Sequence, residues 1–254
     1  MVVTAPVSPA VIWHDLECGA YTADLPLWRE LAMAAAPRDG AGARVLDIGA
    51  GTGRVALDLA RAGHSVTALD IDPELLAAVS DRASGLAVET VRADARDFAL
   101  AHRDFDLCLV PMQTLQLLRG SAERAGLFAC ARAHVREGAL IACALVGEVD
   151  EFDSRAGGLG PSPERVQIGG SLYMSRAMRI ARENGAFVID RERLVIGSGD
   201  RPPAPTEHDR VELEILEEGS LREELRAAGF EPQLTRTIAE TDEHSGSEVV
   251  IGRA

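Results

Sequence analysis

Lysine is absent from the 254-residue sequence, so all 26 basic residues are arginines, and 40 acidic residues outnumber them. No run of basic residues is visible, and the formal net charge is −14. Proteins that bind nucleic acids owe much of their affinity to contacts between basic side chains and phosphates. We therefore expect no DNA or RNA partner.

Cysteine and long apolar runs are also scarce. The four cysteines form neither a CxxC motif nor any spacing typical of metal ligands, and we predict no metal site. The first residues lack the basic stretch and apolar core of a secretory signal, and no apolar run reaches the roughly 18 residues that a membrane span needs. We expect a soluble, cytoplasmic protein that has no membrane partner.

Residues 44–53 combine a short apolar run with three glycines at alternate positions, Arg-Val-Leu-Asp-Ile-Gly-Ala-Gly-Thr-Gly. Val45–Ile48 predicts a buried strand. Residues 55–62 carry apolar side chains at helical spacing, and Gly63 ends that helix. The predicted unit is a strand, a glycine loop and a helix, in which a ligand can approach the backbone closely.

The ligand of this loop is indicated by what surrounds the glycines. The sixth position of the motif is Arg54, where a dinucleotide fingerprint needs glycine, and the Lys-Ser/Thr pair of a phosphate-binding loop is missing. Asp47, just before the turn, would repel a pyrophosphate and attract a cation. S-adenosylmethionine (SAM) is such a cation, and the segment resembles the first motif of the class I SAM-dependent methyltransferases.

Two further acids follow the next two predicted strands. Asp70 ends the strand 65–70, where a carboxylate can accept hydrogen bonds from both ribose hydroxyls. An acid in this position does so in SAM and NAD enzymes alike. Asp94 follows the strand 87–91, and its Ala-Asp-Ala context resembles the family's third motif, whose acid accepts from the adenine amino group. The order and spacing of Asp47, Asp70 and Asp94 are similar to those of the family.

A fourth predicted strand, 105–110, leads into Pro111-Met112-Gln113. This resembles the family's fourth motif, which contributes backbone near the methionine end of SAM and faces the substrate. It differs from the Asn/Asp-Pro-Pro-aromatic motif of enzymes that methylate nucleobases. The resemblance thus implies SAM as cofactor and S-adenosylhomocysteine as product. The residues that it implies for cofactor binding are Tyr21, Asp47, Gly49, Ala50, Gly51, Gly53, Asp70, Ile71, Asp94, Ala95, Pro111, Met112 and Gln113.

The resemblance implies an α/β fold with a doubly wound, mostly parallel seven-strand sheet. We divide the chain into a helical N-terminal segment or lid (1–41), a cofactor-binding core (42–146), an inserted antiparallel sheet (147–217) and a C-terminal completion of the core (218–254). In the lid, Asp24 is a candidate helix cap, and the aromatic residues either cover the cofactor or are ordinary core. Asp72 followed by Pro73 is a candidate helix start, and Ser220 is a candidate cap for a helix over 221–228. A further strand is expected near 233–238.

The inserted segment is predicted to hold about three strands, because apolar residues alternate with polar ones and Asn184-Gly185 is typical of a tight hairpin. In the family such insertions cover the acceptor pocket or form a dimer interface, and a homodimer is expected on that basis. Plain structural padding is the alternative.

A general base is needed only when the methyl acceptor arrives protonated. Among the histidines, His64 and His102 are expected at the surface, whereas His14, His208 and His244 are candidates, with His14 and His244 favoured. Asp242 and Glu243 would help to keep His244 basic near neutral pH. For each of these histidines, a solvated or hydrogen-bonded loop residue is the interpretation that the sequence favours over a base, and catalysis by positioning alone is the alternative.

We therefore predict an enzyme that transfers a methyl group from SAM to oxygen or nitrogen of a small molecule, for example a specialised metabolite. Two alternatives stay open. One is an enzyme of the same fold with a different reaction, such as cyclisation or aminopropyl transfer. The other is a SAM-binding protein that has lost turnover.

Overall fold

The computed structural model describes residues 7–38, 40–157, 160–197, 205–241 and 244–254. The chain divides into two compact units. The α/β unit consists of Tyr21–Glu148 and Leu216–Ala254, and the antiparallel unit consists of the residues up to Ala20 and of Val149–Ile215. No helix in the described ranges is long and apolar enough to cross a membrane.

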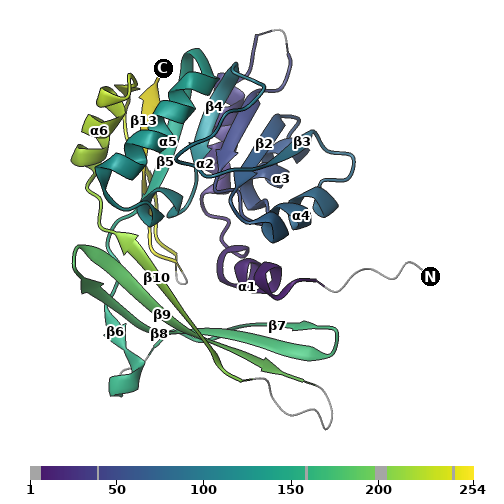
Figure 1. Cartoon of the computed structure of the whole chain (residues 1–254), viewed down its shortest axis with the longest axis vertical. Coiled ribbons are helices and arrows are strands. Elements are labelled where there is room, and N and C mark those ends of the chain that lie inside the picture. The colour runs from purple at the N-terminus through teal and green to yellow at the C-terminus, as the bar shows by residue number, and fades with distance from the viewer. Residues whose placement is uncertain (1–6, 39, 158–159, 198–204, 242–243) are drawn as a thin grey trace. The chain divides into compact units, whose positions relative to one another are not determined.

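The α/β unit is built on a sheet whose described strands run in the order β11-β13-β5-β4-β1-β2-β3, with β12 beside β13. Figure 1 labels β13, β5, β4, β2 and β3 of this sheet. Strands β1 to β5 are parallel, and β13 is antiparallel to β5. The elements of this unit are α2 (Leu25–Ala35), β1 (Arg44–Ile48), α3 (Arg54–Arg61), β2 (Ser65–Asp70), α4 (Pro73–Arg82), β3 (Val88–Arg92), β4 (Phe105–Val110), η1 (Thr114–Leu117), α5 (Gly120–His134), β5 (Val135–Val146), α6 (Glu218–Ala227), β11 (Glu231–Pro232), β12 (Arg236–Ile238) and β13 (Ser247–Arg253).

Successive side chains of each strand point to opposite faces of this sheet, which therefore has two cores. Val45 of β1 packs with apolar residues of α2, α3 and α4, whereas Leu46 packs with those of α5 and α6. The helices thus cover both faces, and the predicted α/β fold with a mostly parallel sheet is confirmed. The edge strand expected near 233–238 is broken into β11 and β12, which both pair with β13.

Several local predictions hold and others are wrong. Asp72 caps α4, because its carboxylate accepts from the backbone N–H of Glu74 at 2.8 Å and Pro73 begins the helix. Ser220 caps no helix, since α6 begins earlier, after Glu217. His64 was expected at the surface, but it is buried and its Nδ1 accepts from the backbone N–H of Ala43 at 3.0 Å.

The antiparallel unit contains a five-stranded sheet among its described residues, whereas the sequence indicated about three strands. The order is β10-β9-β8-β6, with β7 also beside β8 (Figure 1). The predicted hairpin is confirmed: Glu183 pairs with Ala186, and the two residues between them have φ of 49° at Asn184 and 79° at Gly185. The elements are α1 (Pro9–Cys18), β6 (Phe152–Asp153), η2 (Ser154–Ala156), β7 (Glu164–Ile168), β8 (Ser171–Glu183), β9 (Ala186–Ile196) and β10 (Glu207–Glu214).

Helix α1 is bound to the sheet of its own unit by a charged cluster. Glu17 receives two hydrogen bonds of 2.7 Å from the guanidinium of Arg193 and a third from the hydroxyl of Ser175. Trp13 packs edge-on against Tyr173 at 5.4 Å between ring centroids. These contacts fix α1 on β8 and β9, so this helix belongs to the antiparallel unit.

Candidate cofactor site

The glycine loop 49–53 joins β1 to α3 at the carboxyl end of the sheet. Strand β1 lies between β2 and β4, and the chain reverses its strand order there, which is where ligands bind in open α/β sheets. Gly49, Gly51 and Gly53 have φ of 72°, 56° and 88°, values that side chains with a Cβ rarely adopt. A tight turn of this kind brings backbone amides to the edge of the sheet.

Asp70 fixes this loop from the end of β2. One carboxylate oxygen accepts from the backbone N–H of Gly51 at 2.7 Å, and the other accepts from that of Asp72 at 3.0 Å. The backbone N–H groups of Gly49 and Ala50 donate to the carbonyl of Leu69. A carboxylate has about four acceptor positions, so Asp70 keeps acceptor capacity for two ribose hydroxyls while it holds the loop.

Asp47 is the least compensated charge in this part of the molecule. Its side chain is 1% exposed, and neither carboxylate oxygen has a hydrogen-bond partner among the described residues. Burial raises the pKa of Asp47 to about 7, although the nearby Arg54 opposes this rise. Such a carboxylate would be stabilised by a cation bound close to it, so the site fits a positively charged ligand such as SAM.

Asp94 follows β3 and is held by its near neighbour Arg96. The guanidinium donates to both carboxylate oxygens, at 2.9 and 2.7 Å, and the backbone N–H of Arg96 donates as well. These hydrogen bonds lower the pKa of Asp94 to about 2. Ala95 is half-buried beside it, and Ile71 after β2 is 62% exposed. Contact of these residues with adenine stays a prediction.

Arg54 is a site residue that the sequence reasoning missed. It is the first residue of α3, and its guanidinium binds the carboxylate of Asp24 and the carbonyl oxygen of Tyr21, at 2.8 Å for the latter. Asp24 was expected to cap α2, but its side chain makes no cap bond and instead accepts from Arg54 and from Trp28 Nε1. The signal available was an arginine directly after the last glycine.

Tyr21 lies between this arginine and His244 and contacts both. The guanidinium of Arg54 lies over the Tyr21 ring, 5.2 Å from its centroid, and the His244 ring packs edge-on against the same tyrosine at 5.0 Å. Burial raises the pKa of Tyr21. Asp242 and Glu243, expected to act on His244, lie outside the described residues. The other favoured histidine, His14, is half-buried in α1 of the antiparallel unit.

The loop after β4 packs against the glycine loop. A Cβ at Gly49 would lie 2.3 Å from Cγ2 of Thr114, so the two loops are in direct contact. Pro111 is buried, and Met112 has φ of 51°, which is unusual for a residue other than glycine. Gln113 is half-buried beside it. Strained backbone of this kind is concentrated at functional sites.

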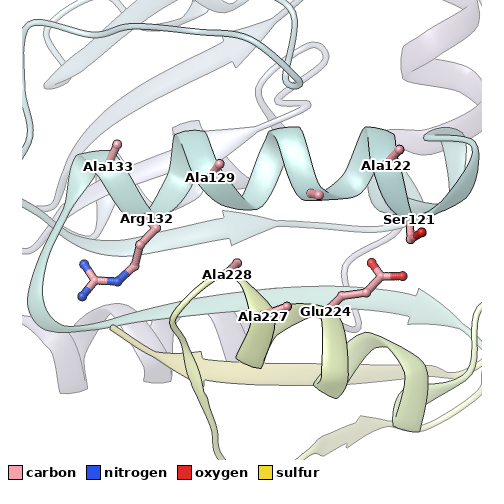
Figure 2. Close-up of a pocket in the computed structure, with 9 residues that line it drawn as sticks. Ser121, Ala122, Ala129, Arg132, Ala133, Glu224, Ala227 and Ala228 are labelled. Carbon is pink, nitrogen blue, oxygen red and sulfur yellow. The ribbon is translucent and has the colours of Figure 1, made fainter.

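A hollow of about 710 Å³ lies between α5 and the end of α6, and none of the residues around the glycine loop lines it (Figure 2). Arg132 of α5 and Glu224 of α6 line it together with a series of alanines. The helices on its two sides are joined by the buried ion pair of Arg124 with Glu224 at 2.8 Å. Its lining is small and weakly polar, unlike the acids around the glycine loop.

Residues 45–138 match the family model described as a methyltransferase domain. This segment of the chain is therefore a methyltransferase domain, similar to those of the class I SAM-dependent enzymes. Over 54 residues the chain is 43% identical to the magnesium-protoporphyrin O-methyltransferase of Rhodobacter capsulatus, a match that covers 21% of this chain and 24% of that protein. A second curated relative, an uncharacterized protein of Mycobacterium bovis, is 38% identical over 76 residues. The two matches cover only 28% and 24% of the lengths of these relatives.

Two solved methyltransferases share the fold over almost the whole chain. The sugar N-methyltransferase KedS8 from Streptoalloteichus has a TM-score of 0.73 at 18% identity, covering 100% of this chain and 95% of its own. The SAM-bound amino pentose methyltransferase CalS10 from Micromonospora echinaspora has a TM-score of 0.71 at 21% identity, covering 99% and 100%. These structures therefore share the fold of both units of the chain.

Proposed function

We propose that the protein transfers the methyl group of SAM to an oxygen or nitrogen atom of a small-molecule acceptor. The observation that carries this proposal is the buried, unpartnered carboxylate of Asp47 beside the glycine loop. Asp70 at the neighbouring strand end has free acceptor capacity for hydroxyls, which adds a second point of recognition. The acidic net charge supports an acceptor other than a nucleic acid.

When bound, SAM supplies a methyl group on a sulfonium, which is already a good leaving group. In this proposal Asp47 stabilises the cationic methionine end, Asp70 accepts from the ribose, and Asp94 with Ala95 and Ile71 contacts the adenine. Backbone at Pro111, Met112 and Gln113 lies near the methionine end of SAM and faces the acceptor. The chain then contributes mainly by holding the acceptor in line and by excluding water.

His244 is the proposed base for an acceptor that arrives protonated. It lies in the α/β unit and contacts Tyr21, which contacts Arg54 directly after the glycine loop. His14 stays the second candidate, from the antiparallel unit. An acceptor that is already an unprotonated amine needs neither histidine, and proximity then suffices.

The neighbours with the same fold guide the choice of acceptors to test, because two of them are named for methylation of sugars or amino pentoses. The decisive assay incubates the protein with methyl-labelled SAM and a panel of amino sugars, sugar alcohols and phenols, followed by mass spectrometry. A methylated product supports the proposal. Tight SAM binding without any product indicates a silent SAM-binding protein, and a product lacking the methyl group indicates a different reaction.

A further inference from the structure

Gln116 makes a pair of hydrogen bonds that joins η1, which follows β4, to the end of β5 in the α/β unit. Its side chain is fully buried in η1. The amide Nε2 donates to the carbonyl oxygen of Val146 at 3.3 Å, and the backbone N–H of Val146 donates to Oε1 at 2.8 Å. The side-chain amide therefore pairs with the last residue of β5 as a neighbouring strand would.

These bonds act on the loop that the proposed function places against the acceptor. Pro111, Met112 and Gln113 lie between β4 and η1, and Met112 has φ of 51°. A residue in such a conformation keeps it only when its surroundings determine it. Thr114 fixes the loop against Gly49, and Gln116 fixes it against the end of β5.

The same contact holds the chain where it leaves the α/β unit. Val146 ends β5, and the antiparallel unit begins at Val149. Both partners of the contact are buried, so water does not offer a replacement for a lost bond. A change at Gln116 therefore loosens the acceptor-facing loop and the end of β5 together.

We propose that Gln116 is a positioning residue for methyl transfer, an inference that rests on the proposed function. It touches neither the acceptor nor the methyl group, and it acts through the loop at Pro111–Gln113. The main anchors of SAM, Asp47, Asp70 and Asp94, lie on other elements. Loss of the Gln116 bonds should therefore lower kcat much more than it weakens SAM binding.

Two variants separate positioning from simple loss of packing. Gln116→Leu keeps most of the side-chain volume and removes both hydrogen bonds. Because the loop is then misplaced, kcat should fall roughly tenfold to a hundredfold, while the Kd of SAM should change less than about threefold. In Gln116→Glu, the protonated acid can form both bonds, whereas the carboxylate cannot donate to the Val146 carbonyl. The ratio of its kcat to that of the unchanged protein should fall as the pH rises, while that of Gln116→Leu stays low at every pH.

Gln233→Leu is the matched control, because it makes the same chemical change at a half-buried amide whose Nε2 bonds locally to the Glu231 carbonyl. Its kcat should equal that of the unchanged protein. Hydrogen exchange of the peptide 111–118 adds a readout that needs no acceptor, and its amides should exchange at least tenfold faster in Gln116→Leu.

The proposal is overturned if Gln116→Leu leaves both kcat and the exchange of this peptide within threefold of their original values. It is also overturned if Gln116→Glu has the same pH profile as the unchanged protein. Faster exchange in a protein that methylates no acceptor would refute the proposed function and leave the structural role of Gln116 standing.

Discussion

Replacing Asp47 with asparagine should stabilise the ligand-free protein at alkaline pH. Asp47 is fully buried without a hydrogen-bond partner among the described residues, and burial raises its pKa from 3.8 to about 7. The native state therefore holds a proton that the unfolded chain loses near pH 4. Stability from this proton is complete below pH 4 and is lost as the pH rises through 7.

The size of the effect follows from the two pKa values. A tenfold difference in proton affinity corresponds to about 1.4 kcal/mol, so ionisation of Asp47 costs about 4 kcal/mol of unfolding free energy between pH 4 and pH 8. The neutral amide of the Asp47→Asn variant carries no such cost. The unfolding free energy of this variant minus that of the unchanged protein should therefore grow with pH by up to about this amount and level off above pH 7.

Urea denaturation of Asp47→Asn and of the unchanged protein at pH 5, 6, 7 and 8 measures this difference. The two proteins have all other titrating groups in common, so the contributions of those groups cancel. The matched control is Asp106→Asn, since Asp106 is also buried but its carboxylate accepts from Arg136 and from the backbone N–H of Arg44. That variant should lose stability at pH 8. Parallel curves for Asp47→Asn and the unchanged protein would refute the reasoning about Asp47.

The same carboxylate links SAM binding to pH. A bound cation favours the ionised form, whose fraction rises from about one in eleven at pH 6 to about one half at pH 7, so SAM affinity should rise roughly fivefold over that interval. Calorimetry in buffers of different ionisation enthalpy should show proton release on binding. Asp47→Asn should bind SAM weakly, with no rise in affinity between pH 6 and 7.

Three further predictions concern neighbouring residues. Asp70→Ala should weaken SAM binding at least tenfold by calorimetry, because two charge-assisted hydrogen bonds of ~1.5–3 kcal/mol each are removed, and unchanged affinity would exclude the ribose assignment. Arg54→Met should lower the unfolding free energy by about 3–5 kcal/mol in urea denaturation, because Asp24 would be left buried and unpaired; a loss below 1 kcal/mol would contradict this. If His244 is the base, His244→Ala should lower kcat by roughly 10²–10⁴ without changing SAM affinity. If kcat falls less than tenfold in both His244→Ala and His14→Ala, catalysis by positioning alone is favoured.

Local sequence patterns were sufficient for features that depend on a few neighbouring residues. The alternating glycines predicted a turn because glycine adopts the positive φ found at all three positions more readily than any other residue. Asn184-Gly185 predicted its hairpin for the same reason, and Asp72-Pro73 predicted the start of α4. The acids at the ends of three parallel strands were predictable as a set, because those ends meet at one edge of the sheet.

Contacts between distant segments decided the rest. Asp24 had the local pattern of a helix cap, but Arg54, 30 residues away, took its carboxylate into a buried ion pair. Gln116 stands between Leu115 and Leu117 in the sequence, and only the fold brings its side-chain amide beside Val146 of β5. The raised pKa of Asp47 likewise depends on the burial that the whole sheet creates, because desolvation is a property of the surrounding volume and not of adjacent residues.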